Sequence, residues 1–558
     1  MQYADDITLT LKNTSSLKKA LQTVELFCCH AGSKINLNKS QCILMGNLKD
    51  KHEIIEGVKV TNSAVRCLGI HIGHDKNKCN ELNWMKTYND MEKLFESWKK
   101  RKLTIFGKSC VVNNLAVSKL IYIASILPLP ENDFIKKVNR AIFNFIWNKH
   151  DRIKRNTLIG KIEEGGIGVI DIELKLKALK ASWVNRLSES CLINEVINAY
   201  LKRVNLNLNY ILSTTERNME DFTVINHIPK FYQEIFCCFN SCKKQNNILN
   251  MSNVTFVQQP LWNNELFKYK GKTLCFLRWI KSGILYVKDL FKKDGKMKTL
   301  NELSDILLKK CNWLCEYNIL RNVIRQQCVN FDMTCSQYTK SNVEKSYTFH
   351  LGWHTITDKK CKFFYENLLT TKFQKPIYKS YYKNMFNVQK ENWKRIYINK
   401  IKNIYDKNIS EFNYKLLNNI LSCNLFLHQC KLRPSRCCDY CQDTTENVEH
   451  LIFECDNVKE IWSKLCTTLH LDIMWKHVII GFYYENNLKV QFLNNIISYV
   501  AYRIYKFKML CRFEEKNETS QSLNEYVKNY LIRDMNYITM YLKSSKYSSK
   551  LKTLINIL

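Results

Sequence analysis

The stretch CDYCQDTTENVEHLIFEC, residues 438–455, carries three cysteines and one histidine at the spacing of a metal site. Cys438 and Cys441 form a Cys-x-x-Cys pair, His450 follows after eight residues, and Cys455 follows after four more. A Cys-x-x-Cys turn presents both sulfurs to one ion, and three thiolates with one imidazole suit tetrahedral Zn²⁺. The sequence therefore predicts a zinc site formed by these four side chains.

Two alternatives stay open at this site. Cys437 directly precedes Cys438 and can replace it as a ligand if the loop takes a different path. His450 can instead be a buried histidine at the start of a helix. Nucleophilic catalysis by cysteine and histidine is disfavoured, because no carboxylate pattern that would orient the base accompanies them.

The length and composition around this site indicate a folded protein of several structural units. The chain has 558 residues, 46% of them hydrophobic and 12% aromatic, which is enough for more than one packed core. The chain has 24 cysteines, and its N-terminus lacks the pattern of a signal peptide. A disulfide scaffold in an oxidising compartment is therefore disfavoured, and we expect reduced thiols. The run LIYIASILPLP (120–130) is too short to cross a bilayer and contains two prolines, so we expect no transmembrane segment.

The net charge of +34 predicts a polyanionic partner. Lys and Arg are distributed along the whole chain and interleaved with Trp, Tyr and Phe. Neutralisation of a phosphate backbone together with base stacking requires this mixture, so nucleic acid is favoured over an anionic membrane or an acidic protein. A solvated basic surface is the alternative.

The N-terminal segment predicts an α+β arrangement with paired carboxylates. Asp5 and Asp6 follow Tyr3-Ala4, and at a tight hairpin turn both carboxylates can reach a divalent-cation site. A helix is expected next, with Leu17, Leu21, Val24 and Cys28 on one face and Gly32 at its end, followed by strand-like stretches at 35–45 and 65–73.

These segments resemble, in order and spacing, the reverse transcriptases of non-LTR (LINE-type) retrotransposons. YADD (3–6) with the strand after it is similar to their catalytic motif. AGSKINLNKSQ (31–41) resembles their Gly-x-x-x-Asn-x-x-Lys-(Ser/Thr) element, and CLGIHIG (67–73) resembles the Leu-Gly strand that grips the primer.

The resemblance implies an RNA-directed DNA polymerase. It implies that Asp5 and Asp6 are catalytic ligands of Mg²⁺ and that Lys39 is a candidate proton donor to pyrophosphate. Residues implied to lie near the nucleotide or primer are Tyr3, Asn36, Leu68 and Gly69.

The resemblance continues through residues 97–183, which are similar to the thumb of these enzymes and the region after it. It implies contacts with the duplex backbone by Lys99, Lys100, Arg101, Lys102, Lys108, Arg152, Lys154 and Arg155. As charge runs alone, such clusters are also typical of solvated surfaces. Zinc sites of the Cys-Cys-His-Cys type lie C-terminal to the polymerase in this family as well.

One part of the family's catalytic apparatus has no counterpart in this sequence. The family uses a third carboxylate on a strand before the Asp-Asp hairpin, together with basic fingers, whereas two residues precede Tyr3 here. The dipeptide Phe331-Asp332 could be proposed as a substitute for the third carboxylate, but it lies after the Asp-Asp motif, whereas the family has this carboxylate before it. We therefore expect a reverse transcriptase fragment that is inactive as an isolated chain.

The alternative is a non-catalytic, zinc-containing nucleic-acid-binding protein derived from a decayed element. A zinc protein that recruits other proteins is a third possibility, but it leaves the charge unexplained.

The expected fold is an α+β palm remnant followed by mostly α-helical domains and a small zinc-binding module. The expected segments are a partial palm at 1–80, a helical thumb at 81–190, a helical connecting region at 191–425, the zinc-binding segment at 426–470 and a C-terminal helical region at 471–558. The implied partners are an RNA template and a DNA primer or target, without a membrane. The implied location is the nucleus or a cytoplasmic ribonucleoprotein.

Overall fold

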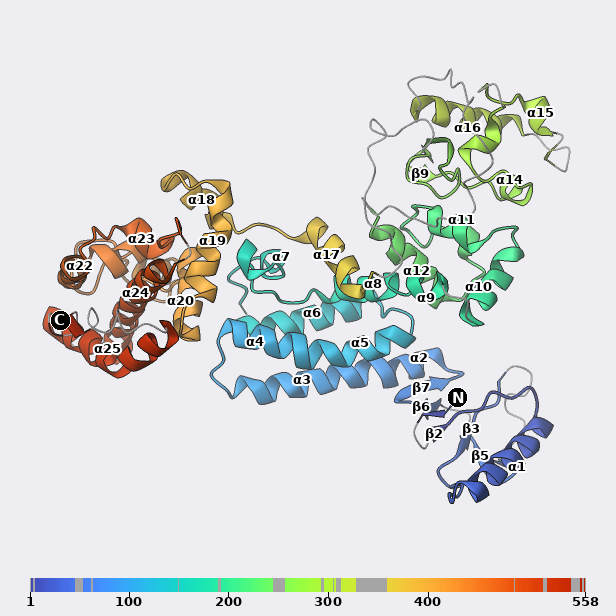
Figure 1. The fold of residues 1–558 in the computed structure, drawn as a ribbon, viewed down its shortest axis with the longest axis horizontal. Coiled ribbons are helices and arrows are strands. Elements are labelled where there is room, and N and C mark those ends of the chain that lie inside the picture. Colours follow the sequence, from blue (N-terminus) through green and yellow to red (C-terminus); the bar gives the residue numbers. More distant parts are fainter. Residues whose placement is uncertain are drawn as a thin grey trace. The chain divides into compact units, whose positions relative to one another are not determined.

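A computed structural model describes most of the chain (Figure 1), which falls into two compact units. Unit 1 comprises Met1–Trp98, Ala116–Val138 and Ile172–Leu368, and unit 2 comprises Lys99–Leu115, Asn139–Asp171 and Leu369–Leu558. The described residues are 2–3, 6–45, 54–61, 64–148, 150–188, 192–243, 256–292, 296–304, 306–307, 313–327, 359–485, 487–514, 519–542, 552–553 and 556. Phe331 and Asp332 lie outside them. The five segments expected from the sequence stay a prediction.

Unit 1 begins with a short hairpin and a helix. Strands β1 (Gln2–Tyr3) and β2 (Asp6–Ile7) pair antiparallel, with Tyr3 opposite Asp6. Helix α1 (Thr14–His30) starts at Asn13, whose side chain accepts a hydrogen bond from the Ser16 backbone at 3.0 Å, as an N-cap residue does. Both elements lie where the sequence predicts them.

The two strand-like stretches differ from expectation. Within 35–45, a turn at 36–40 leaves only the short β3 (Gln41–Cys42), which pairs with β5 (Val58–Val60), and β5 pairs with β4 (Ile54–Ile55). Within 65–73 the expected single strand is a hairpin of β6 (Ala64–Cys67) and β7 (Ile70–Gly73). Leu68 and Gly69 form its turn, with φ of 46° and 83°, because a two-residue hairpin loop needs left-handed backbone.

Helices make up most of the described chain, and the mostly helical fold with few small sheets is confirmed. The palm remnant stays a prediction. In unit 1, or running from it into unit 2, the remaining elements are α2 (Lys76–Asn80), η2 (Glu81–Met85), α3 (Lys86–Lys99), α5 (Val117–Ile126), α6 (Asn132–Trp147), α8 (Ile172–Ala181), α9 (Val184–Ser188), α10 (Leu192–Lys202), α11 (Leu208–Ser213), η5 (Thr223–Ile225), α12 (Lys230–Ser241), β8 (Lys268–Tyr269), β9 (Lys272–Thr273), α14 (Leu277–Lys281), η7 (Val287–Leu290), α15 (Leu300–Ser304), α16 (Leu314–Gln327) and α17 (Cys361–Lys372).

The first part of the apolar run, residues 120–126, belongs to a longer helix than the run alone indicates. Helices α4 (Ile105–Val111), η3 (Val112–Ala116) and α5 are continuous over Ile105–Ile126, and these 22 residues are long and apolar enough to cross a membrane. The expectation that this apolar segment is too short to cross a bilayer was therefore wrong for the helix as a whole. By length and composition alone this is weak evidence, since core helices of soluble proteins pass the same test. Side chains that recur at helical spacing along it are buried: Val112, Ala116, Leu120 and Ile123.

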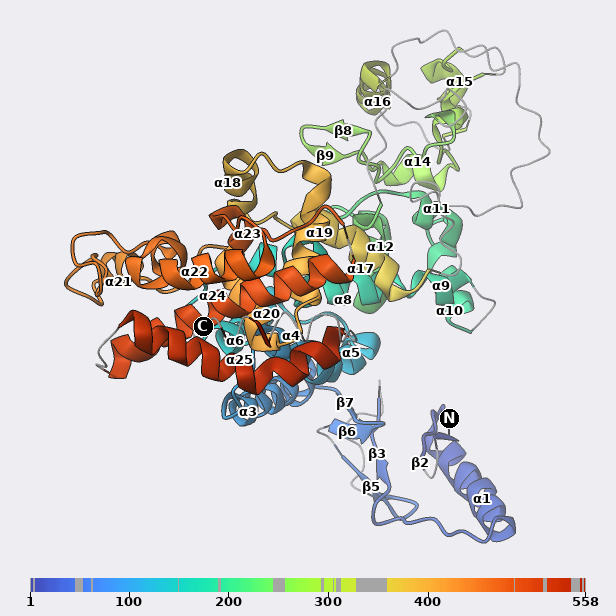
Figure 2. The ribbon, with the colours of Figure 1, turned by 60° about the vertical axis from the view of Figure 1, so that its left-hand side comes forward.

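Unit 2 is almost entirely helical. Its long helices are α24 (Leu488–Glu514) and α25 (Ser520–Leu542), drawn in red tones in Figure 2. A buried ion pair between Arg503 and Asp534 at 2.6 Å joins them, and Tyr499 donates a hydrogen bond to the same carboxylate. Its other elements after residue 138 are α7 (Arg155–Leu158), η4 (Ile162–Glu164), α18 (Ile377–Met385), η8 (Lys390–Asn392), α19 (Trp393–Tyr397), η9 (Ile398–Lys402), α20 (Lys407–Leu417), α21 (Asn424–Gln429), η10 (His450–Glu454), α22 (Asp456–Leu469) and α23 (Trp475–Ile479).

A glycine turn at 165–168 packs inside unit 2. The Asn113 side chain donates to the Gly168 carbonyl at 2.8 Å and accepts from the Ile170 backbone at 2.9 Å. Its amide therefore satisfies two backbone groups at the end of the turn. The Tyr414 hydroxyl donates to the Gly165 carbonyl at 3.2 Å. A Cβ at Gly166 would lie 2.0 Å from the Gly160 carbonyl oxygen, so this backbone approach requires glycine.

We predict that Gly166→Ala lowers the free energy of unfolding of unit 2 by at least about 2 kcal/mol, because backbone atoms must move to admit the methyl group. Gly107→Ala in α4 is the matched control, since its nearest contacts would be ordinary at 3.6 Å. This control should change stability by less than about 1 kcal/mol. Urea unfolding followed by circular dichroism measures both, and equal effects would contradict the prediction.

Candidate metal centre

A tight turn presents two of the predicted ligands. The Cys438 backbone donates to the Thr444 carbonyl at 2.8 Å, and the Gln442 backbone donates to the Cys438 carbonyl at 2.9 Å. Gln442 takes a left-handed conformation with φ of 57°, which closes the turn. Cys438 and Cys441 therefore lie on one small loop, as a Cys-x-x-Cys ligand pair requires.

A π-helical turn presents the other two ligands. Element η10 begins at His450, and the Cys455 backbone donates to the His450 carbonyl at 2.9 Å. The wide turn brings residues five positions apart to one side of the chain. Asn447 fixes its start by accepting from the His450 backbone at 2.7 Å.

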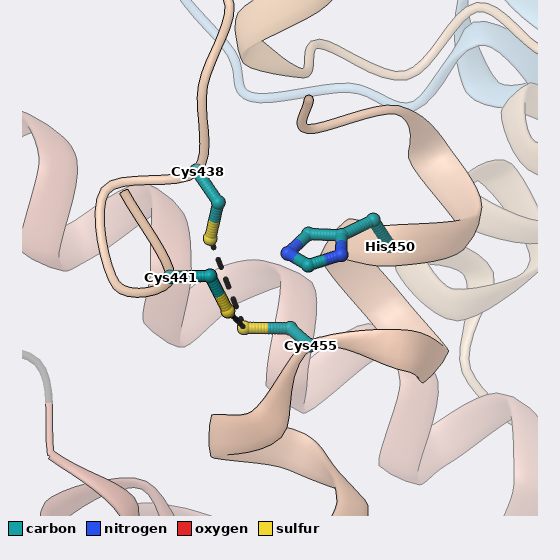
Figure 3. A group of neighbouring side chains, drawn as sticks. All are labelled: Cys438, Cys441, His450 and Cys455. Carbon is teal, nitrogen blue, oxygen red and sulfur yellow. Dashed lines mark hydrogen bonds between the residues drawn. The ribbon is translucent and has the colours of Figure 1, made fainter. Parts of the chain in front are cut away.

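The four side chains converge on one point (Figure 3). Their ligand atoms all lie within 4.8 Å of one another. The Cys455 sulfur lies 3.7 Å from the Cys438 sulfur and 3.6 Å from the Cys441 sulfur, far beyond a disulfide bond. With Zn–S bonds of about 2.3 Å, the edge of a tetrahedron of sulfurs is about 3.8 Å, which these separations approach.

The imidazole supplies a separate observation in favour of a metal. Its Nε2 atom is buried, and no group in the described part of the chain forms a hydrogen bond with it. A buried polar nitrogen without a partner is costly, whereas a metal ion would satisfy it. In Figure 3 the ring points toward the sulfurs. The donor set, its spacing and this nitrogen fit a structural Zn²⁺ site.

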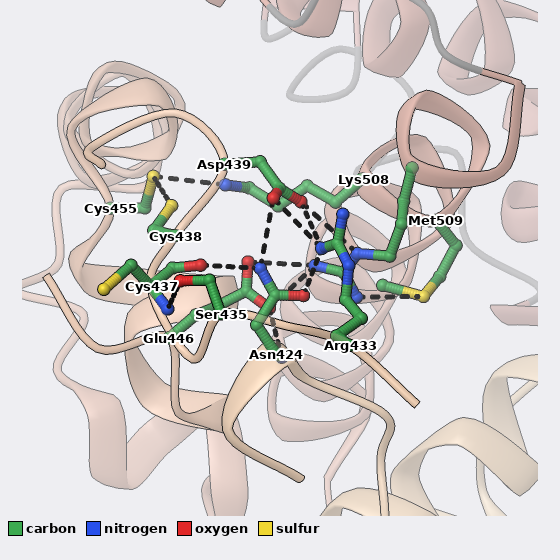
Figure 4. A network of polar contacts seen from close by, with 11 residues as sticks. Asn424, Arg433, Ser435, Cys437, Cys438, Asp439, Glu446, Cys455, Lys508 and Met509 are labelled. Carbon is green, nitrogen blue, oxygen red and sulfur yellow. Dashed lines mark hydrogen bonds and ion pairs between the residues drawn. The ribbon is translucent and has the colours of Figure 1, made fainter. Parts of the chain in front are cut away.

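Cys437 stands outside the cluster. Its backbone pairs with Thr445, its carbonyl accepts from Asn424 at 2.7 Å, and its sulfur is drawn apart from those of Cys438 and Cys455 in Figure 4. The alternative in which Cys437 replaces Cys438 is therefore not the arrangement that the structure shows.

Lys508 from α24 places a positive charge against the cluster. Its ammonium group donates to the Cys455 sulfur at 3.1 Å, and the residue is 2% exposed. The hydrogen bond from Cys438 and the charge of Lys508 lower the pKa of the Cys455 thiol. Three thiolates, a neutral imidazole and Zn²⁺ carry one net negative charge, so Lys508 makes the assembly neutral.

A set of polar contacts around the cluster holds the turn in place (Figure 4). Arg433 donates to Asp439 at 2.8 Å and to the Asn424 side chain at 2.5 Å. Burial raises the pKa of the Asp439 carboxyl, but Arg433 and Arg512 outweigh it, so this pKa lies below its ordinary value. Asp439 is therefore charged at neutral pH and ties the Cys-x-x-Cys loop to α21.

The most buried pair among these contacts joins the turn to α24. Arg512 donates to both oxygens of Glu446, at 2.7 and 2.9 Å, and these side chains are 4% and 2% exposed. Burial raises the pKa of Glu446, while Arg512 opposes this effect. The same carboxylate accepts from the Asn424 backbone at 2.7 Å. Sequence reasoning missed these contacts, although Lys508 and Arg512 lie four residues apart on α24 and so share one side of that helix.

The predicted polymerase residues are placed only in part. Asp5 lies outside the described residues, and Asp6 is exposed at the start of β2. The Asn36 side chain accepts from the Lys39 backbone at 3.1 Å, so this pair forms an exposed turn. Leu68 accepts from the Tyr122 hydroxyl through its carbonyl. Apart from its strand pairing with Tyr3, Asp6 forms no hydrogen bond or ion pair with the other predicted residues of unit 1 that the structure describes.

The residues predicted to contact the backbone of the nucleic-acid duplex all belong to unit 2. Lys108 donates to the Ile146 carbonyl at 3.1 Å and to Asn148, and burial lowers its pKa, so it holds the end of α6. Arg155 pairs with Asp151 at 2.7 Å. Six of these predicted residues are exposed: Lys99, Lys100, Arg101, Lys102, Arg152 and Lys154.

Comparison with known proteins identifies relatives of this region. Residues 377–462 match a family model described as zinc-binding in reverse transcriptase, and this range contains the whole cluster. The chain is also 23% identical over 188 residues to the transposon TX1 uncharacterized 149 kDa protein of Xenopus laevis. That match covers 33% of this chain and 14% of the relative.

These similarities support a C-terminal zinc-binding region related to that of non-LTR retrotransposon reverse transcriptases, in a retrotransposon-derived protein. Together with the Cys₃His cluster they support zinc binding.

We predict one Zn²⁺ per chain, and we predict that Cys441→Ser lowers the free energy of unfolding of unit 2 by at least about 4 kcal/mol, because a structural zinc site supplies folding energy. Cys437→Ser is the matched control and should retain both metal and stability. Elemental analysis with thermal unfolding checks both variants. Folded wild-type protein without zinc would contradict the prediction.

We predict that Lys508→Met lowers zinc affinity about 10- to 100-fold, since it leaves the net negative charge of the ligand set uncompensated in a buried place. Lys506→Met, an exposed position on the same helix, should have no effect. Competition with a chromophoric chelator measures the affinity. Equal affinities of the two variants would show that Lys508 does not support the site.

Proposed function

We propose that this chain is part of the RNA-directed DNA polymerase of a non-LTR retrotransposon, and that its zinc-centred unit 2 binds nucleic acid. The observation that carries the proposal is the Cys₃His cluster, with its unsatisfied imidazole nitrogen, inside the range that matches zinc-binding in reverse transcriptase. The zinc ion would fix the loop that carries Cys438 and Cys441 against α24, and so set the shape of the surrounding surface.

The distribution of charge supports a nucleic acid as the ligand. The chain carries a net charge of +34, and the cluster shares unit 2 with the exposed basic residues at 99–102 and 152–154. Backbone phosphates attract such side chains whatever the sequence of the nucleic acid. We propose an RNA template and a DNA primer or target as the partners.

The proposed role of the N-terminal segment is that of a partial palm. Mg²⁺ held by Asp5 and Asp6 would stabilise the charge that develops on the transferred phosphate. In the described residues 6–45 the buried apolar side chains are Cys28 and Leu44, whereas Leu26 is 62% exposed and Phe27 is 53% exposed. This small core supports the proposal that the isolated chain does not polymerise.

A second candidate is a non-catalytic zinc-containing nucleic-acid-binding protein. The four zinc ligands and the exposed basic residues belong to unit 2, whereas Asp6 belongs to unit 1, so the proposed binding does not need the polymerase motif.

We predict that the purified chain binds nucleic acid with an affinity that falls steeply with salt. Lys100→Ser with Lys102→Ser should reduce the slope of log affinity against log salt by about 1 to 2. Lys18→Ser with Lys19→Ser, two exposed lysines of α1, is the charge-matched control. Fluorescence anisotropy over a salt series measures the slopes, and absence of binding would contradict the proposed function.

The same preparation separates the two candidates. Given a primed RNA template, deoxynucleotides and Mg²⁺, the isolated chain should not extend the primer. Extension that is abolished by Asp5→Ala would overturn this expectation and would favour the polymerase over the non-catalytic protein.

A further inference from the structure

One of the three cysteine ligands differs from the other two in its exposure. Cys441 is partly exposed on the Cys-x-x-Cys loop, whereas Cys438 and Cys455 are buried, with 2% and 0% of their surface exposed. A small solute that approaches the cluster from solvent therefore meets Cys441 more readily than either of the other cysteines. Among the sulfur ligands, Cys441 is the one open to chemical modification.

A second sulfur lies within reach of the Cys441 sulfur. The sulfur of Cys455 is 3.6 Å away, and Figure 3 draws the two beside each other. The sulfurs of a disulfide are about 2 Å apart, so these two need to approach by about 1.5 Å to form a bond. All cysteines in the described part of the chain are free, so this pair is reduced in the structure.

A bound zinc ion would hold the Cys441 sulfur in the form that reacts with peroxides. Zinc binds the deprotonated sulfur, and the thiolate is also the nucleophile in oxidation. Cys430 provides the contrast, because it is exposed but lies outside the ligand cluster. Thiolate character, access from solvent and a neighbouring resolving cysteine are the features of cysteines that undergo reversible oxidation.

We propose that Cys441 is a site of reversible oxidation by hydrogen peroxide, and that Cys455 resolves the oxidised sulfur to a disulfide, with release of the zinc ion. In the first step the Cys441 thiolate attacks one peroxide oxygen, the O–O bond breaks, hydroxide leaves and a sulfenic acid forms. In the second step the Cys455 thiolate attacks the Cys441 sulfur and displaces a second hydroxide. The two thiolates lose one electron each, the peroxide gains two, and two protons from solvent convert the hydroxides to water.

The disulfide would change both the ligand set and its surroundings. Two of the four ligands would be lost, and Cys438 with His450 alone makes an incomplete site for Zn²⁺. The disulfide is neutral, so it would also remove the negative charge that the buried Lys508 ammonium group contacts at 3.1 Å. Oxidation would therefore weaken the contact between the zinc-binding segment and α24. The inference goes beyond the proposed function, because it needs the zinc site but no nucleic acid.

The test uses the zinc-loaded full chain and hydrogen peroxide. A chromophoric chelator records zinc release, and mass spectrometry of the alkylated, proteolysed protein maps the cross-links. We expect release of the zinc together with a Cys441–Cys455 disulfide, and a lower thermal unfolding temperature of the oxidised protein. Dithiothreitol followed by Zn²⁺ should restore both the metal content and the unfolding temperature, since a disulfide is reversible by a thiol.

Three variants separate this site from general cysteine oxidation. Cys430→Ser removes an exposed cysteine outside the cluster, Cys437→Ser removes the neighbour of a ligand, and neither should change the rate of zinc release. Cys441→His replaces the sulfur with another zinc ligand and should slow release at least about fivefold, because the sulfur that the peroxide oxidises is gone. If this variant does not hold zinc, the cross-link mapped in the wild-type chain decides the question by itself.

Several outcomes would overturn the inference. Retention of zinc while peroxide oxidises Cys430 would show that the cluster is protected. Release of zinc with a Cys438–Cys441 disulfide, or with a cross-link to Cys437, would assign the chemistry to another pair. Release that dithiothreitol and Zn²⁺ do not reverse would show damage in place of a reversible site. Folded wild-type protein without zinc would overturn the zinc site and, with it, the observation that carries the proposed function.

Discussion

The buried contact between α24 and the zinc-binding segment at 438–455 is the interaction on which the C-terminal part of unit 2 depends. Lys508 and Arg512, one helical turn apart, meet Cys455 and Glu446 in an almost solvent-free environment. A buried charge without a partner costs several kcal/mol, so neither side of this contact can be removed alone. The charge of the metal cluster therefore helps to fix the position of α24 in unit 2.

The four ligands could be predicted from the sequence because they are local. They lie within 18 consecutive residues. The two-residue spacing of Cys-x-x-Cys and the single helical turn between His450 and Cys455 restrict the positions that the four side chains can take. The contacts that support the ligands could not be predicted, since Lys508 and Arg512 reach the loop across more than 50 residues of chain through tertiary packing. Nothing in the local spacing marks Glu446 as the partner of Arg512.

The same division between local and tertiary information holds for the fold. The sequence correctly placed helix α1, because the apolar spacing of Leu17, Leu21 and Val24 and the stop at Gly32 are local signals. Short apolar stretches were less informative. The pattern of residues 65–73 predicts one strand, yet Leu68 and Gly69 reverse the chain, and only the left-handed backbone at both positions reveals the hairpin.

Cys455 has two roles in the chain, and their combination has a consequence for the protein in a cell. It is the last ligand of the cluster and also the residue at which α22 begins, where no side chain caps the helix. Without its metal, the start of this helix is tied to the Cys-x-x-Cys loop by the thiol contacts of Cys455, whereas a bound ion would join it to the three other ligands. Local opening at this point would expose the backbone to proteases, and a bound ion would oppose that opening. Zinc supply during synthesis would in this way determine how long each copy of the protein survives.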